Sequence, residues 1–330
     1  MPMGDGIRRD VAMISQEERN RLRDAFVELH RRFYPGKRDD VPAGGVSHWF
    51  KQDEIHQATH IHSFQGRGII FLPWHRELCN RLEALLREAD PELSLHYWDW
   101  TADPQNSPDG AGGSVNLFTP DFMGAASGTE AGEPWLSAYF YDPNADPPRG
   151  EFEGDPSGSG NPVDPPSSLI RSVGAGVPAL GFSDDQIIEG ETFPEMRGRL
   201  EHAHDLSHGY IGGTIGNPHT SFRDPFVFLL HSNVDRLFAL WQLQSGKEWR
   251  LEPEQVYGTE SNTDVIPGSL TFDPGMKTPL EPWAGNLNSN PHVHTTRPWA
   301  SPEDEHLMLE NRKNSKHPSV VDPPAYVTNP

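Results

Sequence analysis

Residues 224–242, DPFVFLLHSNVDRLFALWQ, decide the fold of this chain. Apolar side chains recur through this stretch at helical spacing: Phe226, Leu229, Leu230, Leu237 and Leu240. The pattern predicts a largely apolar helix over residues 225–244 that is buried in the core. His231 lies inside the apolar run, where an imidazole is costly unless it meets a partner or a metal. Asp235 follows one turn later and is placed to accept a hydrogen bond from the His231 ring.

Other segments on the N-terminal side of this stretch also show helical patterns. Ser15 and Glu18 form a capping box ahead of an amphipathic helix over residues 16–32. Pro73 opens another helix, whose apolar face carries Leu78, Leu82, Leu85 and Leu86. Further helical patterns run over residues 193–210 and, with a weaker period, over residues 49–60. These helices predict a mainly α protein with a helical-bundle core.

Long segments between and after the helices are rich in Gly, Pro, Ser and Asp. Residues 101–166 have no sustained period and carry Pro-Pro pairs, which predicts a loop-rich insertion. Beyond Gly246 the chain is Pro-rich and polar to its end. We therefore expect long loops, little sheet, one helical domain over residues 1–285, and an extended polar tail over residues 286–330.

Charge and cysteine content narrow the classes of partner. Lys and Arg number 27 against 48 Asp and Glu, so the net charge of −21 argues against nucleic acid and anionic membranes as partners. The single cysteine, Cys79, excludes a disulfide within the chain and a cysteine-rich metal cluster. No stretch reaches the roughly 18 apolar residues of a membrane span, and residues 1–15 lack the apolar run of a signal peptide. We expect a soluble, cytoplasmic protein, with secretion alongside a partner protein as the alternative.

Histidines form two groups. His204 and His208 stand at positions i and i+4 of a predicted helix, so both rings leave one face and can share a metal. With His231 they make the second group in chain order. The first group contains His56, His60, His62 and His75. Imidazoles without cysteine or carboxylate ligands suit copper or zinc better than magnesium or calcium.

Four segments resemble motifs of the tyrosinase and catechol oxidase family of type 3 copper proteins. FLPWHREL at residues 71–78 is similar to the FLPWHR signature of the family's first copper site, and YWDW at residues 97–100 resembles the PYWDW that follows it. HDLSH at residues 204–208 resembles the HNxxH of the second copper site. Residues 224–242 are similar to the DPxFxLHHxxxDRxxxxWQ that closes that site. The motifs occur in the family's order.

The resemblance implies two copper ions held by histidines. It assigns the second copper to His204, His208 and His231, with Leu230 in place of the first of the family's paired histidines.

For the first copper, the resemblance matches His56 to the first ligand and His75 to the third. The family's usual position for the second ligand holds Gly66 here. His62 would serve if four residues were inserted in the loop, and His60 is its rival. We prefer His62 because His60 lies one helical turn from His56 and can face the core instead.

The resemblance also implies an oxidase. With O2 as co-substrate it would convert a small phenolic substrate, an o-diphenol, to an o-quinone, and an o-aminophenol is equally compatible. Hydroxylation of monophenols would need a water held by Glu195 and by an Asn next to the first ligand of the second site, where this chain has Asp205. Pro218 and His219 fall at the substrate pocket.

Two other classes of function remain open. HDLSH differs from the zinc-protease motif HExxH only in Asp205, but that carboxylate is one carbon short for a general base and FLPWHR would go unexplained. A non-catalytic oxygen carrier of the haemocyanin kind uses a similar copper pair. The sequence leaves a homo-oligomer open as well.

Overall fold

The computed structural model describes residues 4–32, 47–50, 52–53, 56, 71–128, 169–218, 220–252, 256 and 323–326. These residues are mainly helical, which confirms the predicted fold class.

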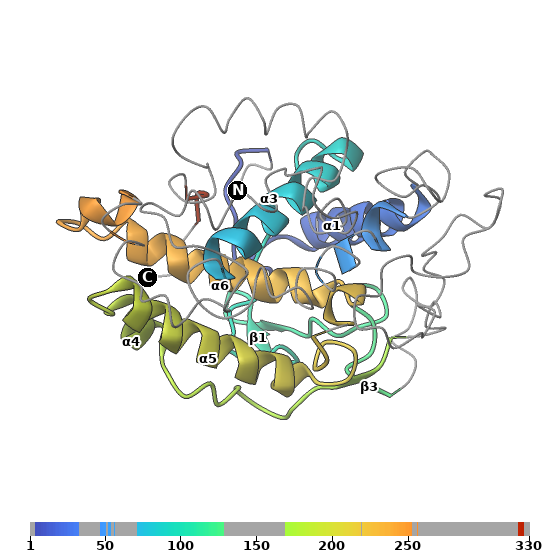
Figure 1. Cartoon of the computed structure of the whole chain (residues 1–330). Coiled ribbons are helices and arrows are strands. Elements are labelled where there is room, and N and C mark those ends of the chain that lie inside the picture. The colour runs from blue at the N-terminus through green and yellow to red at the C-terminus, as the bar shows by residue number, and fades with distance from the viewer. Residues whose placement is uncertain are drawn as a thin grey trace, which may run out of the picture.

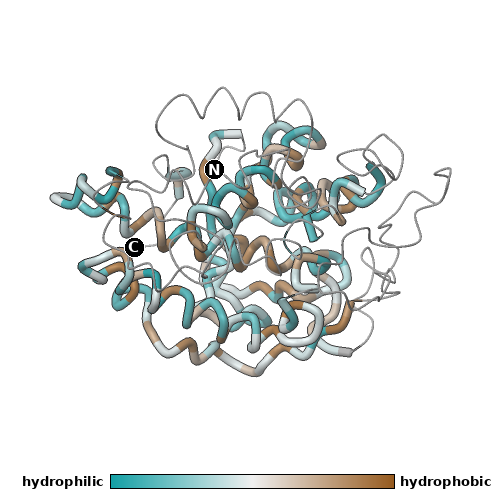
Figure 2. Tube along the Cα trace, viewed as in Figure 1, coloured by the Kyte–Doolittle hydropathy of each residue, from teal (hydrophilic) through white to brown (hydrophobic). Residues whose placement is uncertain are grey.

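Helix α6, Phe226–Gln242, is the centre of the core (Figure 1). Every residue of this helix except Leu240 is buried. Each large apolar side chain buried in this way contributes about 1.5–3 kcal/mol. Figure 2 shows apolar residues gathered along α6, whereas polar residues dominate the outer helices. The apolar stretch therefore forms the central helix that its sequence predicts.

Two layers of helices enclose α6 (Figure 1). On one side α3, Phe71–Ala89, packs directly on α6, and α1, Gln16–Arg31, packs on α3. On the other side lie α4, Asp184–Ile188, and α5, Phe193–Ile211. The histidine-bearing helices α3 and α5 thus contact α6 from opposite sides.

The ends of α5 are set by local sequence. Thr192 accepts a hydrogen bond from the Glu195 N–H and caps the first turn, and Pro194 occupies the start of the helix. At the other end Gly212 and Gly213 adopt φ values of 64° and 58°. A Cβ on Gly213 would lie 2.0 Å from the carbonyl oxygen of Ile170, so this turn requires glycine.

Sheet is sparse among the described residues. Strand β1, Ser107–Pro108, pairs antiparallel with β2, Ser114–Val115, and β3, Ser127–Gly128, pairs antiparallel with β4, Arg171–Ser172. Short 3-10 helices lie at η2, Ser221–Arg223, and η3, Glu248–Leu251. The described part of the predicted insertion, residues 101–128, consists of turns, irregular segments and the strands β1, β2 and β3.

Element boundaries agree with the predictions to within about two residues. Helix α3 begins at Phe71, two residues before the predicted Pro73. The described residues of the predicted helix 49–60 are helical, although most of that segment lies outside the described residues. Only residues 323–326 of the predicted tail are described, so the domain boundary at 285 stays a prediction.

Candidate metal centre

Three imidazoles from α5 and α6 converge on one point. His231 Nε2 lies 3.3 Å from His204 Nε2 and 3.2 Å from His208 Nε2. Two nitrogens bound to one metal at about 2.0–2.1 Å and tetrahedral angles would lie about 3.3–3.4 Å apart. Both distances from His231 match this spacing, and the ligand atoms of all three histidines lie within 4.8 Å of one another, as a shared transition-metal ion requires.

Hydrogen bonds on the outer side of two of these rings turn their Nε2 atoms inward. His208 Nδ1 donates to the carbonyl oxygen of Ile215 at 2.8 Å, a contact made by the glycine turn after α5. His204 Nδ1 lies 3.0 Å from Asp205 Oδ1, whose side chain is 64 % exposed. Such partners fix the ring orientation and leave Nε2 as the ligand atom.

Asp235 does not orient His231, contrary to the sequence prediction. Its two carboxylate oxygens accept hydrogen bonds from Arg8, Arg76 and Tyr326. These donors come from distant parts of the chain, which spacing within one helix cannot reveal.

The two described histidines of the first group lie beside this triad. His75 donates from Nδ1 to the carbonyl oxygen of Phe71 at 2.8 Å, and its ring stacks on His231 with centroids 4.5 Å apart and planes 11° apart. The ring of His56 is 5.7 Å from that of His75 and stacks on Phe222 at 4.1 Å. The packing thus brings His56, His75 and His231 together, although they come from separate segments.

Three predicted residues lie outside the described residues: His62, its rival His60, and His219. The choice of the second ligand of the first copper therefore stays a prediction. Pro218 is exposed on the turn after α5.

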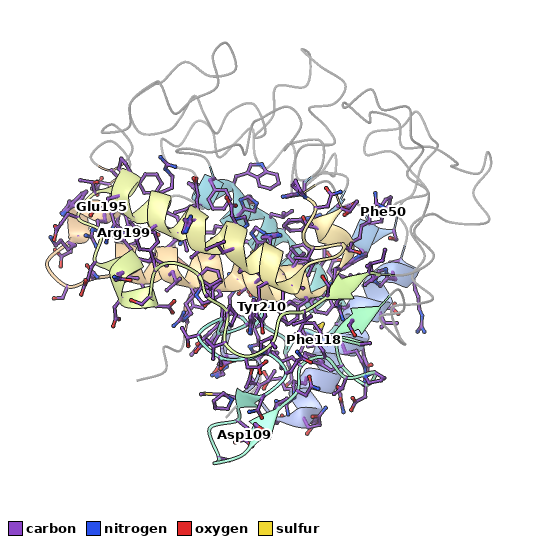
Figure 3. All side chains as sticks on the ribbon, turned by 90° about the horizontal axis from the view of Figure 1, so that it is seen from below. Phe50, Asp109, Phe118, Glu195, Arg199 and Tyr210 are labelled. Atoms are coloured by element: carbon purple, nitrogen blue, oxygen red, sulfur yellow. The ribbon has the colours of Figure 1, made fainter. Side chains whose placement is uncertain are left out.

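The structure does not bring Glu195 and Asp205 together. Glu195 lies in the first turn of α5, where its carboxylate is 42 % exposed, pairs with Arg199 and accepts the Glu191 N–H at 3.0 Å. Because α5 is one continuous helix, the nine residues from Glu195 to His204 span about 13.5 Å and end on the opposite face. Figure 3 shows Glu195 and Arg199 near one end of α5 and Tyr210 toward the other. The expected water-holding pair of carboxylates is thus not formed.

Sequence reasoning also missed two groups that support the site. The carbonyl of Ile215 orients His208, and Phe222 packs against His56 and His231, with ring centroids 4.1 Å and 5.0 Å away. The pair Gly212-Gly213 was the available signal for the first, since it marks a tight turn beside the helix end. No pattern within residues 220–223 indicates that Phe222 packs against the histidines.

Burial keeps the His208 and His231 imidazoles of the metal-free protein neutral. It lowers the pKa of His208 from its ordinary 6.5 to about 3, and the neighbouring His204 adds to the effect. Burial likewise lowers the pKa of His231 well below the ordinary value. Neutral imidazole is the form that binds metals.

We expect the metal-free protein to be sensitive to acid. As the pH falls below 6.5, the His208 ring takes up a proton in the unfolded chain but not in the folded one until about pH 3. The contribution of the neutral His208 ring to the free energy of unfolding is therefore fully present above pH 6.5 and is lost as the pH falls toward 3. The loss is roughly 1.4 kcal/mol per pH unit for each such imidazole. Urea unfolding between pH 7.5 and pH 5 measures this slope. In the His208→Gln variant, the free energy of unfolding should depend less steeply on pH, by the part that one imidazole contributes. An equal slope in both proteins would contradict the prediction.

A helical core that presents imidazoles from three helices, without cysteine among the ligands, defines a metalloprotein whose donors suit copper. Residues 46–244 match the family model described as the common central domain of tyrosinase. The chain belongs to the tyrosinase family of type 3 copper proteins.

Individual relatives agree with this assignment. The chain is 29% identical over 278 residues to the putative tyrosinase-like protein tyr-3 of Caenorhabditis elegans, covering 79% of this chain and 34% of that protein. It is 27% identical to a tyrosinase of Streptomyces antibioticus, covering 71% of this chain and 78% of the relative. It is also 26% identical to Hemocyanin 1 of Megathura crenulata, over 92% of this chain but 8% of that protein.

The fold has a counterpart of known structure. A polyphenol oxidase from Thermothelomyces thermophila aligns with a TM-score of 0.51 and 17% identity, covering 79% of each chain. This likeness concerns the fold. Among the residues that the structure describes, no helix is both long enough and apolar enough to cross a lipid bilayer.

Proposed function

We propose that the protein is a copper-dependent oxidase that converts o-diphenols to o-quinones with dioxygen. One observation carries the proposal. His231 makes a triad with His204 and His208 through Nε2 at 3.2–3.3 Å, while its ring stacks at 4.5 Å on His75 of the other group. Two groups of imidazoles in direct contact suit two metal ions that act on one molecule of dioxygen.

The residues of the chain would hold and orient the copper ions, and bound copper would supply the exchange of electrons with dioxygen. Ile215 and Phe71 fix the rings of His208 and His75 through their carbonyl oxygens. Each o-diphenol loses two electrons and two protons to become the quinone. Two diphenols therefore reduce one dioxygen to two waters, and the reaction balances without another reductant.

The proposal gives Asp205 a role through His204. A carboxylate that accepts the Nδ1–H of a ligand histidine fixes its tautomer and raises its basicity. The diphenol reaction needs no further base. Hydroxylation of monophenols is not part of the proposal, because Glu195 faces solvent at the far end of α5.

The geometry argues against a zinc hydrolase. In that reading Asp205 would act as a general base on a metal-bound water, on the side of the His204 ring where Nε2 lies. Its carboxylate instead lies 3.0 Å from Nδ1, on the other side of the ring.

An oxygen carrier is the second candidate. The similarity to Hemocyanin 1 over 92% of this chain favours it. A carrier would bind dioxygen reversibly at the same histidines without oxidising a phenol.

Copper content and substrate turnover test the proposal together. The protein purified with copper should bind about two coppers per chain, oxidise catechol with uptake of dioxygen, and leave resorcinol unchanged, since a meta-diphenol forms no quinone. An o-aminophenol should be oxidised as well, because it loses the same electrons and protons. Reversible uptake of dioxygen without catechol oxidation would assign the carrier function instead. One metal per chain, or zinc in preference to copper, would contradict both.

A further inference from the structure

A buried arginine near the N-terminus connects the two central helices. Arg8 is 1% exposed, and its Nε and Nη2 donate to Glu83 Oε2 at 2.6 Å and Asn80 Oδ1 at 2.8 Å, both on α3. Its Nη1 donates to Asp235 Oδ2 on α6 at 2.9 Å. One guanidinium therefore bridges α3 and α6.

A second arginine makes the same connection from within α3. Arg76 donates from Nε to the other oxygen of Asp235 and from Nη1 to Gln242 Oε1 on α6 at 2.7 Å. Its guanidinium also lies over the Phe238 ring, 4.2 Å from the centroid. The two arginines balance the charges of Asp235 and Glu83, which is the condition for burying such a network.

This network is adjacent to the histidine groups along both helices. Arg76 directly follows His75 on α3, and Asp235 lies one turn after His231 on α6. The rings of His75 and His231 stack on one another at 4.5 Å. A shift of α3 relative to α6 would therefore disturb the charges and the two imidazoles together.

The far end of the chain completes the network. Residues 323–326, the red segment in Figure 1, lie beside the N-terminal segment, where the Arg8 N–H donates to the Ala325 carbonyl oxygen at 2.9 Å. The Tyr326 hydroxyl donates to Asp235 Oδ2 at 2.8 Å and accepts from Arg8 Nη1 at 2.7 Å. The phenol thus closes a triangle with the Arg8–Asp235 pair, and Arg8 also lies over its ring, 5.5 Å from the centroid.

We propose that Tyr326 is a positioning residue for the metal centre. Its hydroxyl holds the Arg8–Asp235 pair together and, through that pair, the separation of α3 and α6 at which His75 stacks on His231. Hydrogen bonds to charged groups are roughly twice as strong as neutral ones, so this hydroxyl stabilises the Arg8–Asp235 pair effectively. The metal part of the inference rests on the proposed function, whereas the bracing of the two helices does not.

Hydrogen exchange of the metal-free, full-length protein tests the bracing. Tyr326→Phe keeps the ring over Arg8 and removes only the hydroxyl. We expect amide exchange about tenfold faster within α3 and α6 and unchanged in α1. Tyr210→Phe is the matched control, since its hydroxyl donates to the Gly176 carbonyl oxygen outside this network, and it should leave α3 and α6 unchanged. Unaltered exchange in both central helices, or an equal increase in every helix, would overturn the proposal.

Copper release tests the consequence for the metal centre. From the copper-loaded protein, transfer of copper to an excess of chelator under native conditions should be about tenfold faster for Tyr326→Phe and unchanged for Tyr210→Phe, because supporting residues beyond the ligands typically alter metal binding by such factors. Equal rates in the two variants would overturn the positioning role. If the unsubstituted protein binds no copper pair, the proposed function fails, while the exchange measurement still decides whether Tyr326 braces the helices.

Discussion

Replacing His231 with alanine should remove about one copper per chain and nearly all catechol oxidation. The Nε2 of this ring is shared by the contacts to His204 and His208, and its face packs on His75. The substitution therefore removes one of the three ligands of the second copper site and also the ring contact to His75 of the first site. Elemental analysis of the copper-loaded protein and oxygen uptake with catechol measure the two effects.

His202→Ala is the matched control for this variant. His202 lies on α5 two residues before His204, but it is exposed and its ring packs against Phe182 with centroids 5.7 Å apart. It should retain both coppers and full turnover. A His231→Ala protein with two coppers, or a His202→Ala protein with one, would show that the triad is not the metal site.

Asp224→Ala should lower the free energy of unfolding by about 3–5 kcal/mol, the range for breaking a buried ion pair on one side. Both Asp224 oxygens accept from Arg171 at 2.6 Å, and both residues are buried. Asp224 Oδ1 also accepts the Phe226 N–H at 3.0 Å, at the start of α6. The variant leaves the Arg171 charge buried alone and the helix start without its acceptor. Urea unfolding at neutral pH measures the loss.

Glu191→Gln serves as the comparison, because its pair with Lys247 at 2.9 Å is largely exposed to solvent. Exposed pairs contribute little to stability, so this variant should unfold like the unsubstituted protein. A similar loss of unfolding free energy in the two variants would contradict the prediction that the buried ion pair contributes more to stability than the exposed one.

Periodicity was sufficient to predict the helices and the second group of histidines. The spacing of His204 and His208 places both rings on one face, and the apolar run around His231 forces that ring into the core. These are local properties of a helix, so the sequence alone defines them. The five-residue α4 escaped prediction because it is too short to show a period.

Long-range contacts were not predictable in the same way. Asp235 looks from spacing alone like a partner of His231, but Arg8 reaches it from 227 residues away and Arg76 from 159. Glu195 was assigned by resemblance to a family position, and the continuity of α5 then carries it away from His204. Such errors arise wherever a side chain has several partners that only the packed structure can rank.

The contact between the two histidine groups encloses far more chain than the contacts within the second group. His204 and His231 are 27 residues apart, on helices joined by one short connection. Since 156 residues separate His75 from His231, closing that loop costs about 1.6 kcal/mol more of chain entropy by the logarithmic dependence on length. Loosening of α3 from α6 would therefore separate His75 from His231, while the α5–α6 hairpin keeps its triad of His204, His208 and His231.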